Sequence, residues 1–214
     1  MPAKKKAAAK RTLRTETMEQ TRAALVAAAE SLFAEEGLDA SLDAICERAG
    51  YTRGAFYVHF ADRDALLVAV METVGARFLA QMFASPAPAP GGGGALASAA
   101  ARFVGAVEGG SYPLMSAESS KTRIRFHQLL DACARSPKIR AQYRGLVEAS
   151  IEHVASLALL DRMSGALRPD LDPTALGKLM LATIIGAQTM AELGVLVDAG
   201  ALAKTMLASL SRSK

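Results

Sequence analysis

Apolar residues recur at helical spacing along most of the chain. The first such stripe consists of Leu25, Ala28, Ala29, Leu32 and Phe33. This spacing places all five on one helix face and predicts an amphipathic helix from about residue 17 to residue 36. Thr17 and Gln20 have the spacing of a capping box at its start, and Gly37 can end it.

Two short helices are predicted directly afterwards. The apolar positions of the first are Leu42, Ile45, Cys46 and Ala49. Ser41 precedes this stripe as an N-cap, Gly50 ends it, and Thr52 can cap a second helix at about 53–58. Two short helices with so tight a glycine-containing link have the geometry of a helix-turn-helix, in which the second helix enters the major groove of DNA.

The remaining chain is also predicted to be helical, which makes the fold class all-α. The expected helices span about 63–83, 95–108, 121–135, 137–163, 173–193 and 195–210. Asp62, Ser136 and Asp172 stand where N-caps are needed, and proline follows the last two. Gly177 and Gly186 are small enough to let neighbouring helices approach closely.

Two segments of the second half carry more specific expectations. Residues 85–94 hold three prolines and four glycines, so we expect an exposed loop there. In the helix expected at 121–135, the residues near one face are predicted to be Ile124, His127 or Gln128, Leu130 and Asp131.

Charge is distributed unevenly over the 214 residues, although the net charge is only +4. Residues 1–14 contain six lysines and arginines and no acid, whereas residues 15–63 contain nine acids and four arginines. We therefore predict a basic arm at 1–16 that is disordered in isolation and either contacts DNA or serves as a solubilising tail. The helix-turn-helix domain is assigned to 17–64 and a second helical domain to 65–214.

The second short helix supplies candidates for contacts with DNA. Arg53 lies in its first turn, where a guanidinium can donate two hydrogen bonds to guanine, and the small Gly54 and Ala55 permit close approach. Tyr57 and His59 can donate to phosphate oxygens. The alternative is that these side chains only pack or cap a small helical domain.

The residues 41–67, from SLDAI through AGYTRGAFYVHF to DRDALL, resemble the N-terminal domain of the tetracycline-repressor (TetR) family of bacterial regulators. The resemblance runs from about Thr21 to Leu67, about a quarter of the chain, with Cys46 and Arg63 as mild departures. It implies a second domain that binds a small-molecule effector, a signal carried by the helix at 63–83, and a phosphate contact by Arg63. It also implies a homodimer through the helices at about 172–194 and 195–211.

The effector and its pocket are less well defined by the sequence. Candidate pocket residues are Phe103, Met115, Arg123, Phe126 and His127. Methionines and phenylalanines could form a soft apolar wall or ordinary core. The basic residues between 121 and 144 could hold an anionic effector or form a solvated helix face.

Other chemistry finds little support in the sequence. His127, Asp131 and Cys133 form an incomplete set of metal ligands, and no nucleophile, base and acid have a recognisable catalytic spacing. We expect no enzyme activity, no metal and no cofactor. The two cysteines indicate a reducing, cytoplasmic location, and the apolar stretch 176–196 is interrupted by polar residues, which argues against a membrane span.

Taken together, the sequence predicts a ligand-responsive repressor that binds a palindromic operator in double-stranded DNA as a homodimer. Arg53, Gly54 and Ala55 would read bases, and Ser41, Thr52, Tyr57, His59 and Arg63 would contact phosphates. One alternative is an architectural DNA-binding protein that tolerates many sequences and depends on its basic arm. Another is a helical enzyme or carrier that has lost DNA binding.

Overall fold

The computed structural model describes residues 2–83, 94–109 and 125–210, with side chains from residue 16 onward. Within these ranges the chain forms helices and no strand, which confirms the all-α fold class. The helices are α1 (Pro2–Glu36), α2 (Leu42–Ala49), α3 (Arg53–His59), α4 (Arg63–Phe83), α5 (Ala95–Glu108), α6 (Phe126–Arg135), α7 (Pro137–Met163), α8 (Pro173–Glu192) and α9 (Ala199–Leu210).

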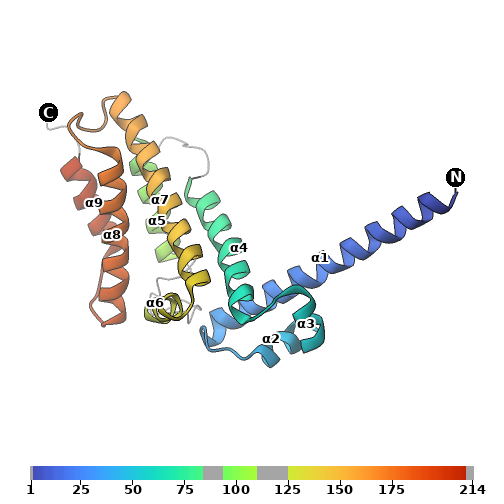
Figure 1. Cartoon of the computed structure of the whole chain (residues 1–214). Coiled ribbons are helices and arrows are strands. Elements are labelled where there is room, and N and C mark those ends of the chain that lie inside the picture. The colour runs from blue at the N-terminus through green and yellow to red at the C-terminus, as the bar shows by residue number, and fades with distance from the viewer. Residues whose placement is uncertain (1, 84–93, 110–124, 211–214) are drawn as a thin grey trace.

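Helix α1 is longer than the sequence pattern predicted. It begins at Pro2 instead of Thr17, so the predicted capping box is wrong and the segment predicted to be disordered is helical in the structure. The physical reason is local, because residues 3–36 contain no glycine or proline and residues 3–14 are mostly alanine, lysine and arginine, which favour helix. The extension projects away from the body of the molecule (Figure 1).

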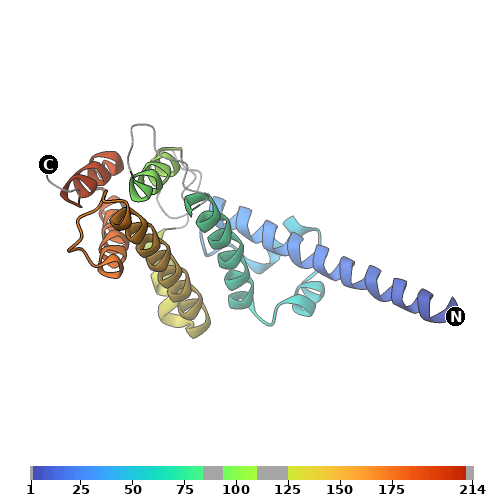
Figure 2. The ribbon, with the colours of Figure 1, turned by 90° about the horizontal axis from the view of Figure 1, so that it is seen from above.

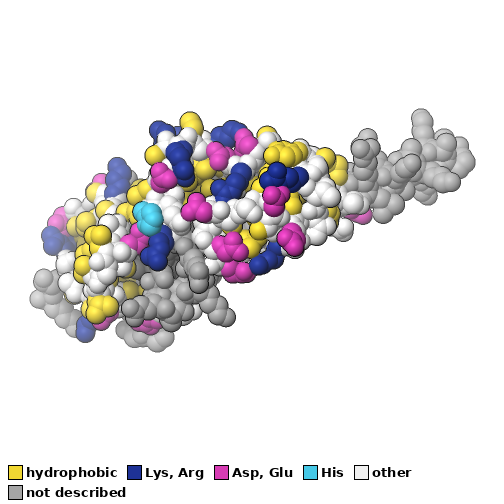
Figure 3. Space-filling view, turned by 90° about the horizontal axis from the view of Figure 1, so that it is seen from below, with side chains coloured by type: hydrophobic (Ala, Val, Ile, Leu, Met, Phe, Trp, Pro, Cys, Tyr) yellow, Lys and Arg dark blue, Asp and Glu magenta, His cyan; other side chains and the backbone are white. Residues whose placement is uncertain are grey.

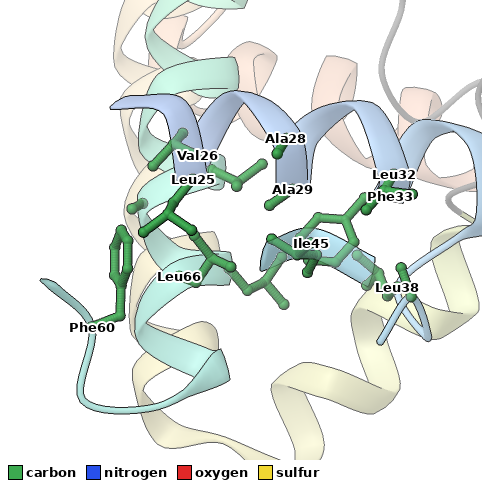
Figure 4. Packing of buried hydrophobic residues seen from close by; sticks show 14 of the residues in the cluster. Leu25, Val26, Ala28, Ala29, Leu32, Phe33, Leu38, Ile45, Phe60 and Leu66 are labelled. Atoms are coloured by element: carbon green, nitrogen blue, oxygen red, sulfur yellow. The ribbon is translucent and has the colours of Figure 1, made fainter. Parts of the chain in front are cut away.

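The N-terminal domain is built around the apolar face of α1. Figure 4 shows Leu25, Leu32 and Phe33 of α1 facing Ile45 of α2 and Leu66 of α4. All five are at most 2% exposed, which confirms the face predicted for α1. Burial of each side chain contributes about 1.5–3 kcal/mol to folding, so this cluster fixes the orientation of α2 and α4 on α1.

The same core continues into the second domain. Leu129, Ala132 and Cys133 of α6 and Ile139 of α7 belong to the buried cluster that contains the helix-turn-helix core. A salt bridge of 2.9 Å between Lys138 and Asp62 lies across the same junction. The apolar core therefore has no break at the boundary predicted near residue 64.

Helix α4 belongs to both halves of the molecule. It packs against α1 on one side and against α5 and α7 on the other (Figure 1). Among the described helices, α4 alone has the length and apolar composition to cross a membrane. Its position between two packed layers accounts for that composition.

The second domain is a layered helical bundle in which α7 and α8 run along one another (Figure 2). A Cβ atom added at Gly177 of α8 would lie 2.8 Å from the backbone oxygen of Ile151, so a side chain is excluded there. This confirms the close approach predicted at Gly177. Gly186 has no atom within 4 Å of an added Cβ, so the same prediction for Gly186 is wrong within the described chain.

Most helix boundaries agree with the sequence pattern, and three details differ. Helix α9 begins at Ala199 instead of Val195, because the Asp198 side chain accepts a hydrogen bond from the Ala201 amide at 2.8 Å. Helix α6 begins at Phe126, and residues 121–124 lie outside the described residues. His127, Leu130 and Asp131 lie on its exposed face, whereas the residues buried on α6 are Phe126, Leu129, Ala132 and Cys133.

Two carboxylates cap helices far away in the sequence. Asp161 of α7 accepts hydrogen bonds from the amides of Ala95 and Leu96, at 2.6 and 3.0 Å, at the start of α5. Glu192 of α8 accepts from the Phe126 amide at the start of α6. A negative charge at a helix N-terminus satisfies orphan amides and complements the helix dipole. These contacts tie α5 and α6 to the α7–α8 layer.

Candidate nucleic-acid interface and ligand cavity

The helix-turn-helix forms through the local caps that the sequence predicted. The Ser41 hydroxyl oxygen accepts a hydrogen bond from the Ala44 amide at 3.1 Å, and the Thr52 hydroxyl oxygen accepts from the Ala55 amide at 3.2 Å. Gly50 separates the two helices with φ +74°, a left-handed conformation that favours glycine. Both caps use an oxygen lone pair, so each hydroxyl hydrogen remains able to donate to a phosphate.

Helix α3 presents most of its surface to solvent. Phe56 is its buried residue, and its ring stacks on Phe60 at 5.5 Å and meets Tyr57 edge-on at 5.1 Å. Tyr57 is 59% exposed and Val58 is 66% exposed. A helix that buries one anchor and displays its other faces has the form of a recognition helix.

Val58 was not singled out from the sequence. An exposed valine on a recognition helix can contact the methyl group of thymine, which is one of the ways a protein reads the major groove. Its position on α3 between Tyr57 and His59 could have indicated this role, because the two flanking residues were already candidates.

Arg53 is held by a neighbour that the sequence analysis did not identify. Its Nε lies 2.5 Å from one carboxylate oxygen of Asp43 in α2, and its Nη2 donates to the other oxygen at 2.9 Å. Both side chains are more than half exposed, so the pair is solvated. This two-point contact fixes the direction of the guanidinium before any DNA is bound. Gly54 beside it is open, with only the Thr52 hydroxyl at 3.6 Å from an added Cβ.

Arg63 has a different position from the one expected for a phosphate contact. Its Nη2 donates to the backbone oxygens of Leu38 and Ala40, the latter at 2.8 Å, and its guanidinium lies 5.7 Å from the centre of the Phe33 ring. Arg63 therefore holds the α1–α2 loop in place. A phosphate contact by Arg63 would have to use its other N–H groups.

The other arginines of this domain also have partners within the protein. Arg48 forms a salt bridge with Glu35 at 2.6 Å, and this contact lowers the pKa of the Glu35 carboxyl from 4.5 to about 2. The Arg22 guanidinium lies over the Phe60 ring at 5.2 Å. Figure 3 shows basic and acidic side chains interspersed on this end of the molecule. Positive charge for DNA is consequently concentrated in the sequence of the α1 extension.

The second domain contains a cavity of about 260 Å³ that is partly open. Its walls come mainly from α4, α5, α7, α8 and α9, with Phe33 of α1 and Leu129 of α6 at one end, and representative residues are Phe78, Phe103, Ile184 and Leu202. No charged side chain is among the described residues that line it. The cavity is therefore suited to an apolar molecule.

The predicted pocket residues divide into three groups. Phe103 lines the cavity, as predicted, whereas Met115 and Arg123 lie outside the described residues. Phe126 and His127 do not line this cavity, so the cavity gives no support to their assignment to the ligand pocket. Phe126 is 4% exposed in the core at the start of α6, and its ring lies 6.5 Å from that of Tyr143. The helix turn that buries Phe126 directs His127 outward.

His127 lies at the surface beside Glu192, with 3.0 Å between Nδ1 and the carboxylate oxygen. Cys133 is buried in the core, and among the described residues no group of three potential metal ligands lies together. Burial raises the pKa of the Cys133 and Cys46 thiols, which keeps both protonated and makes them poor nucleophiles.

The described part of the basic run follows the helix surface. Arg135 pairs with Asp131 at 2.9 Å, and Arg140 donates to the backbone oxygen of Cys133 at 3.0 Å. Arg125 is exposed at the start of α6. These contacts fit the interpretation of a solvated face better than that of an anion site.

Large apolar side chains are exposed near the ends of α7, α8 and the α8–α9 connection. The most exposed are Leu196 at 96%, Met163 at 77%, Leu193 at 76%, Leu179 at 54% and Val195 at 52%. Leu193, Val195 and Leu196 stand close together in the chain directly after α8, and exposed apolar side chains grouped in this way are typical of a surface that another protein covers.

The sequence and the structure of this chain were compared with those of known proteins. The sequence profile of bacterial regulatory proteins of the tetR family matches residues 25–70. A search of curated protein sequences found no match. Among solved structures, a SmeT–triclosan complex is 26% identical with a TM-score of 0.68, and the alignment covers 90% of this chain and 92% of that chain.

Two further solved structures have the same fold. GusR from Salmonella enterica is 21% identical with a TM-score of 0.67, covering 90% of this chain and 96% of its own. SmeT, the repressor of the Stenotrophomonas maltophilia multidrug efflux pump SmeDEF, is 24% identical with a TM-score of 0.65, covering 91% and 93%. The similarity therefore extends over both domains.

Proposed function

We propose that this chain is a transcriptional repressor that a small-molecule effector releases from DNA. The premise is that the chain belongs to the tetR family of bacterial regulatory proteins and is a DNA-binding transcriptional regulator. The observation that carries the proposal is the combination of an exposed recognition helix with an apolar cavity, since α4 lines the cavity and directly follows α3 in the chain. A molecule that fills the cavity can act on the position of α4 and hence on α3.

Contacts with DNA are assigned to the exposed face of α2 and α3. Arg53 reads a base, with Gly54 and Ala55 allowing close approach, while the Ser41 and Thr52 hydroxyls and the side chains of Tyr57 and His59 donate to phosphates. Val58 is added as an apolar base contact because it is 66% exposed on the same helix. Arg63 contributes mainly by holding the α1–α2 loop.

A homodimer is supported by the exposed apolar residues of α8 and the segment that follows it. Leu196 is 96% and Leu193 is 76% exposed in the single chain, and a second copy would cover both. A two-fold dimer presents two recognition helices to a palindromic operator whose half-sites are separated by about one helical turn or a multiple of it. Such a protein acts in the cytoplasm without enzyme activity.

Effector release is supported by the cavity and by a neighbour of similar fold. SmeT has been solved in complex with triclosan, and it is named as the repressor of a multidrug efflux pump. In the proposed mechanism, ligand binding favours a dimer whose recognition helices are wrongly spaced for the operator, which shifts the population off DNA.

The proposal is tested by selecting binders from a random duplex library with the full chain at near-physiological salt and sequencing the retained DNA. A two-fold symmetric consensus is the expected result. Retained DNA without a consensus would instead support a sequence-tolerant architectural protein, whose binding should vanish when residues 1–14 are deleted. Retention of no duplex would contradict a repressor that binds DNA without ligand.

The dimer is tested separately with Leu196→Asp. A charge at this exposed position should convert the dimer to a monomer in sedimentation analysis while leaving the helical content unchanged. Leu130→Asp is a matched control, because Leu130 is 46% exposed on α6, outside the two helices proposed for the interface. A dimer that survives Leu196→Asp would remove this surface from the interface.

A further inference from the structure

Gln188 of α8 is the one described residue with a buried side-chain polar atom that has no hydrogen-bond partner. The side chain is 3% exposed, and the unpartnered atom is its amide nitrogen, Nε2. Leaving a buried amide donor without an acceptor is costly, and native proteins retain few such groups. An unpaired amide in a folded domain therefore calls for an acceptor that the chain alone does not supply.

Gln188 also contributes to the wall of the 260 Å³ cavity. The other polar groups of that wall differ from it. Ser150 and Thr183 use their hydroxyl hydrogens within the helices, donating to the backbone oxygens of Leu146 and Leu179 at 2.8 Å each. Tyr143 is the fourth polar side chain of the wall and is only half-buried, so among the described wall residues Gln188 is the one with a fully buried donor that has no partner.

The remaining wall determines the rest of the ligand. It is made of aromatic, methionine and aliphatic side chains, and the described part includes no charge that could compensate an ionised group. Burying an ion in such surroundings would cost far more than one amide contact returns. An engineered apolar cavity of about 150 Å³ holds benzene, so 260 Å³ accommodates a molecule of roughly two fused rings.

From these observations we propose that the cavity binds a neutral, mostly apolar molecule of about two rings that carries one oxygen acceptor, and that Gln188 donates a hydrogen bond to that oxygen. This inference rests on the proposed function and adds the chemical class of the effector. It replaces the expectation of an anion held by arginine and His127, because His127 lies outside the cavity and the described basic residues follow the surface.

The test uses the full chain and three probes of similar shape: methyl naphthyl ketone, isopropenylnaphthalene and naphthoate. Calorimetry should show that the ketone binds roughly five- to tenfold more tightly than the hydrocarbon of the same shape, as expected for one net hydrogen bond. Naphthoate should bind most weakly. Equal binding of ketone and hydrocarbon, tighter binding of naphthoate, or binding of none of the three would overturn the proposal.

A pair of variants assigns the preference to one residue. Gln188→Met has a side chain of similar length without the amide, so it should bind the ketone and the hydrocarbon equally and unfold at a slightly higher temperature. Thr183→Val is the matched control, because its hydroxyl is already used within α8, and it should retain the preference. A preference that survives Gln188→Met, or is lost in Thr183→Val, would assign the acceptor to another group.

Measuring release from the selected DNA separately distinguishes this inference from the proposed function. If the ketone binds with the expected preference but leaves DNA binding unchanged, the cavity chemistry holds and effector release fails. If only naphthoate releases the DNA, effector release holds and the assignment to Gln188 is wrong.

Discussion

The two halves of the molecule use apolar residues in opposite ways. The six largest fully buried side chains among the described residues, Phe33, Phe56, Leu25, Leu32, Ile45 and Leu66, all belong to the core of the helix-turn-helix half, to which α4 contributes Leu66. The second half has more apolar helices, yet it contains a 260 Å³ cavity and exposes Leu193 and Leu196 at its surface.

This difference teaches how stability and binding are divided along the chain. A close-packed core holds α3 in one orientation and leaves little room for adjustment. The second half leaves apolar surface uncovered in two places, inside the cavity and outside on α8. Its full stability therefore depends on what fills or covers those surfaces, which is the property required of a sensor.

The largest expected effect contrasts two phenylalanines. Phe56→Ala removes a fully buried ring in the close-packed half and should lower the free energy of unfolding by about 3–5 kcal/mol. Phe103→Ala only enlarges an existing cavity around a half-buried ring, so we expect a loss of about 1–2 kcal/mol. Chemical denaturation of both variants measures the two values. Equal losses would show that the two halves are packed alike.

A second comparison concerns the two glycines of α8. Gly177→Ala places a methyl group against the Ile151 backbone oxygen and should destabilise the fold by about 1–3 kcal/mol. Gly186→Ala places its methyl group in open space in the single chain and should be neutral or slightly stabilising. Thermal unfolding of both variants measures the difference. If Gly186→Ala abolishes the dimer while the monomer stays folded, Gly186 is a close-approach position between chains.

The third prediction concerns the Arg53–Asp43 pair. Arg53→Ala should lower affinity for the selected operator by about 1–3 kcal/mol and relax one base position. Asp43→Ala keeps the Arg53 guanidinium but removes the carboxylate that fixes its direction, so discrimination at that base should fall. Binding to random duplex should increase slightly, because one negative charge is lost. Competition binding with single-base operator variants measures both effects.

Folding provides the control for this pair. Because the Arg53–Asp43 contact is solvated, Asp43→Ala should change the free energy of unfolding by less than about 1 kcal/mol. Unchanged base discrimination in a folded Asp43→Ala protein would remove Asp43 from the recognition mechanism.

The smallest effect is the pH dependence of the Arg48–Glu35 salt bridge. The pKa of Glu35 is lowered from 4.5 to about 2 in the folded protein, so its stabilising contribution is present above about pH 4.5 and is lost as the pH falls toward 2. Glu35→Gln should flatten this part of the stability profile slightly, as befits an exposed pair. Thermal unfolding between these pH values measures the change.

A suitable control for the pH experiment is Glu47→Gln, since Glu47 is exposed on α2. The control should retain the slope of the unmodified protein in that range. A Glu35→Gln profile that matches the unmodified protein would mean that other carboxylates determine its acid sensitivity.

The sequence predicted those parts of the fold that depend on neighbours along the chain. Ser41, Gly50, Thr52 and Asp62 act within a few residues of their own positions, and the bounds of α2, α3 and α4 were confirmed or nearly so. Signals of this kind are local because a cap and its helix turn are covalently adjacent.

The contacts that the sequence could not predict join residues far apart. Asp161 caps α5 across 66 residues, and Arg63 reaches the Leu38 oxygen across 25. Gln188 is one of the polar residues that interrupt the apolar stretch 176–196, and its burial depends on helices that are far apart in the sequence and meet around the cavity. The start of α1 was predicted wrongly for another reason. Disorder of residues 1–16 was inferred from their like charges, but their high helix propensity had the larger effect.

The core shared between α1 and α6 has a consequence for building hybrid regulators. A DNA-reading head cut from this chain after α4 would lose Leu129, Ala132 and Ile139 from its own interior. Grafted onto a foreign sensor, it would present an open apolar face and aggregate unless the new partner supplied a helix of matching shape. The unit that can be transferred to another protein is therefore α1–α4 together with α6 and the first turn of α7. These two segments of the chain have to be transferred together.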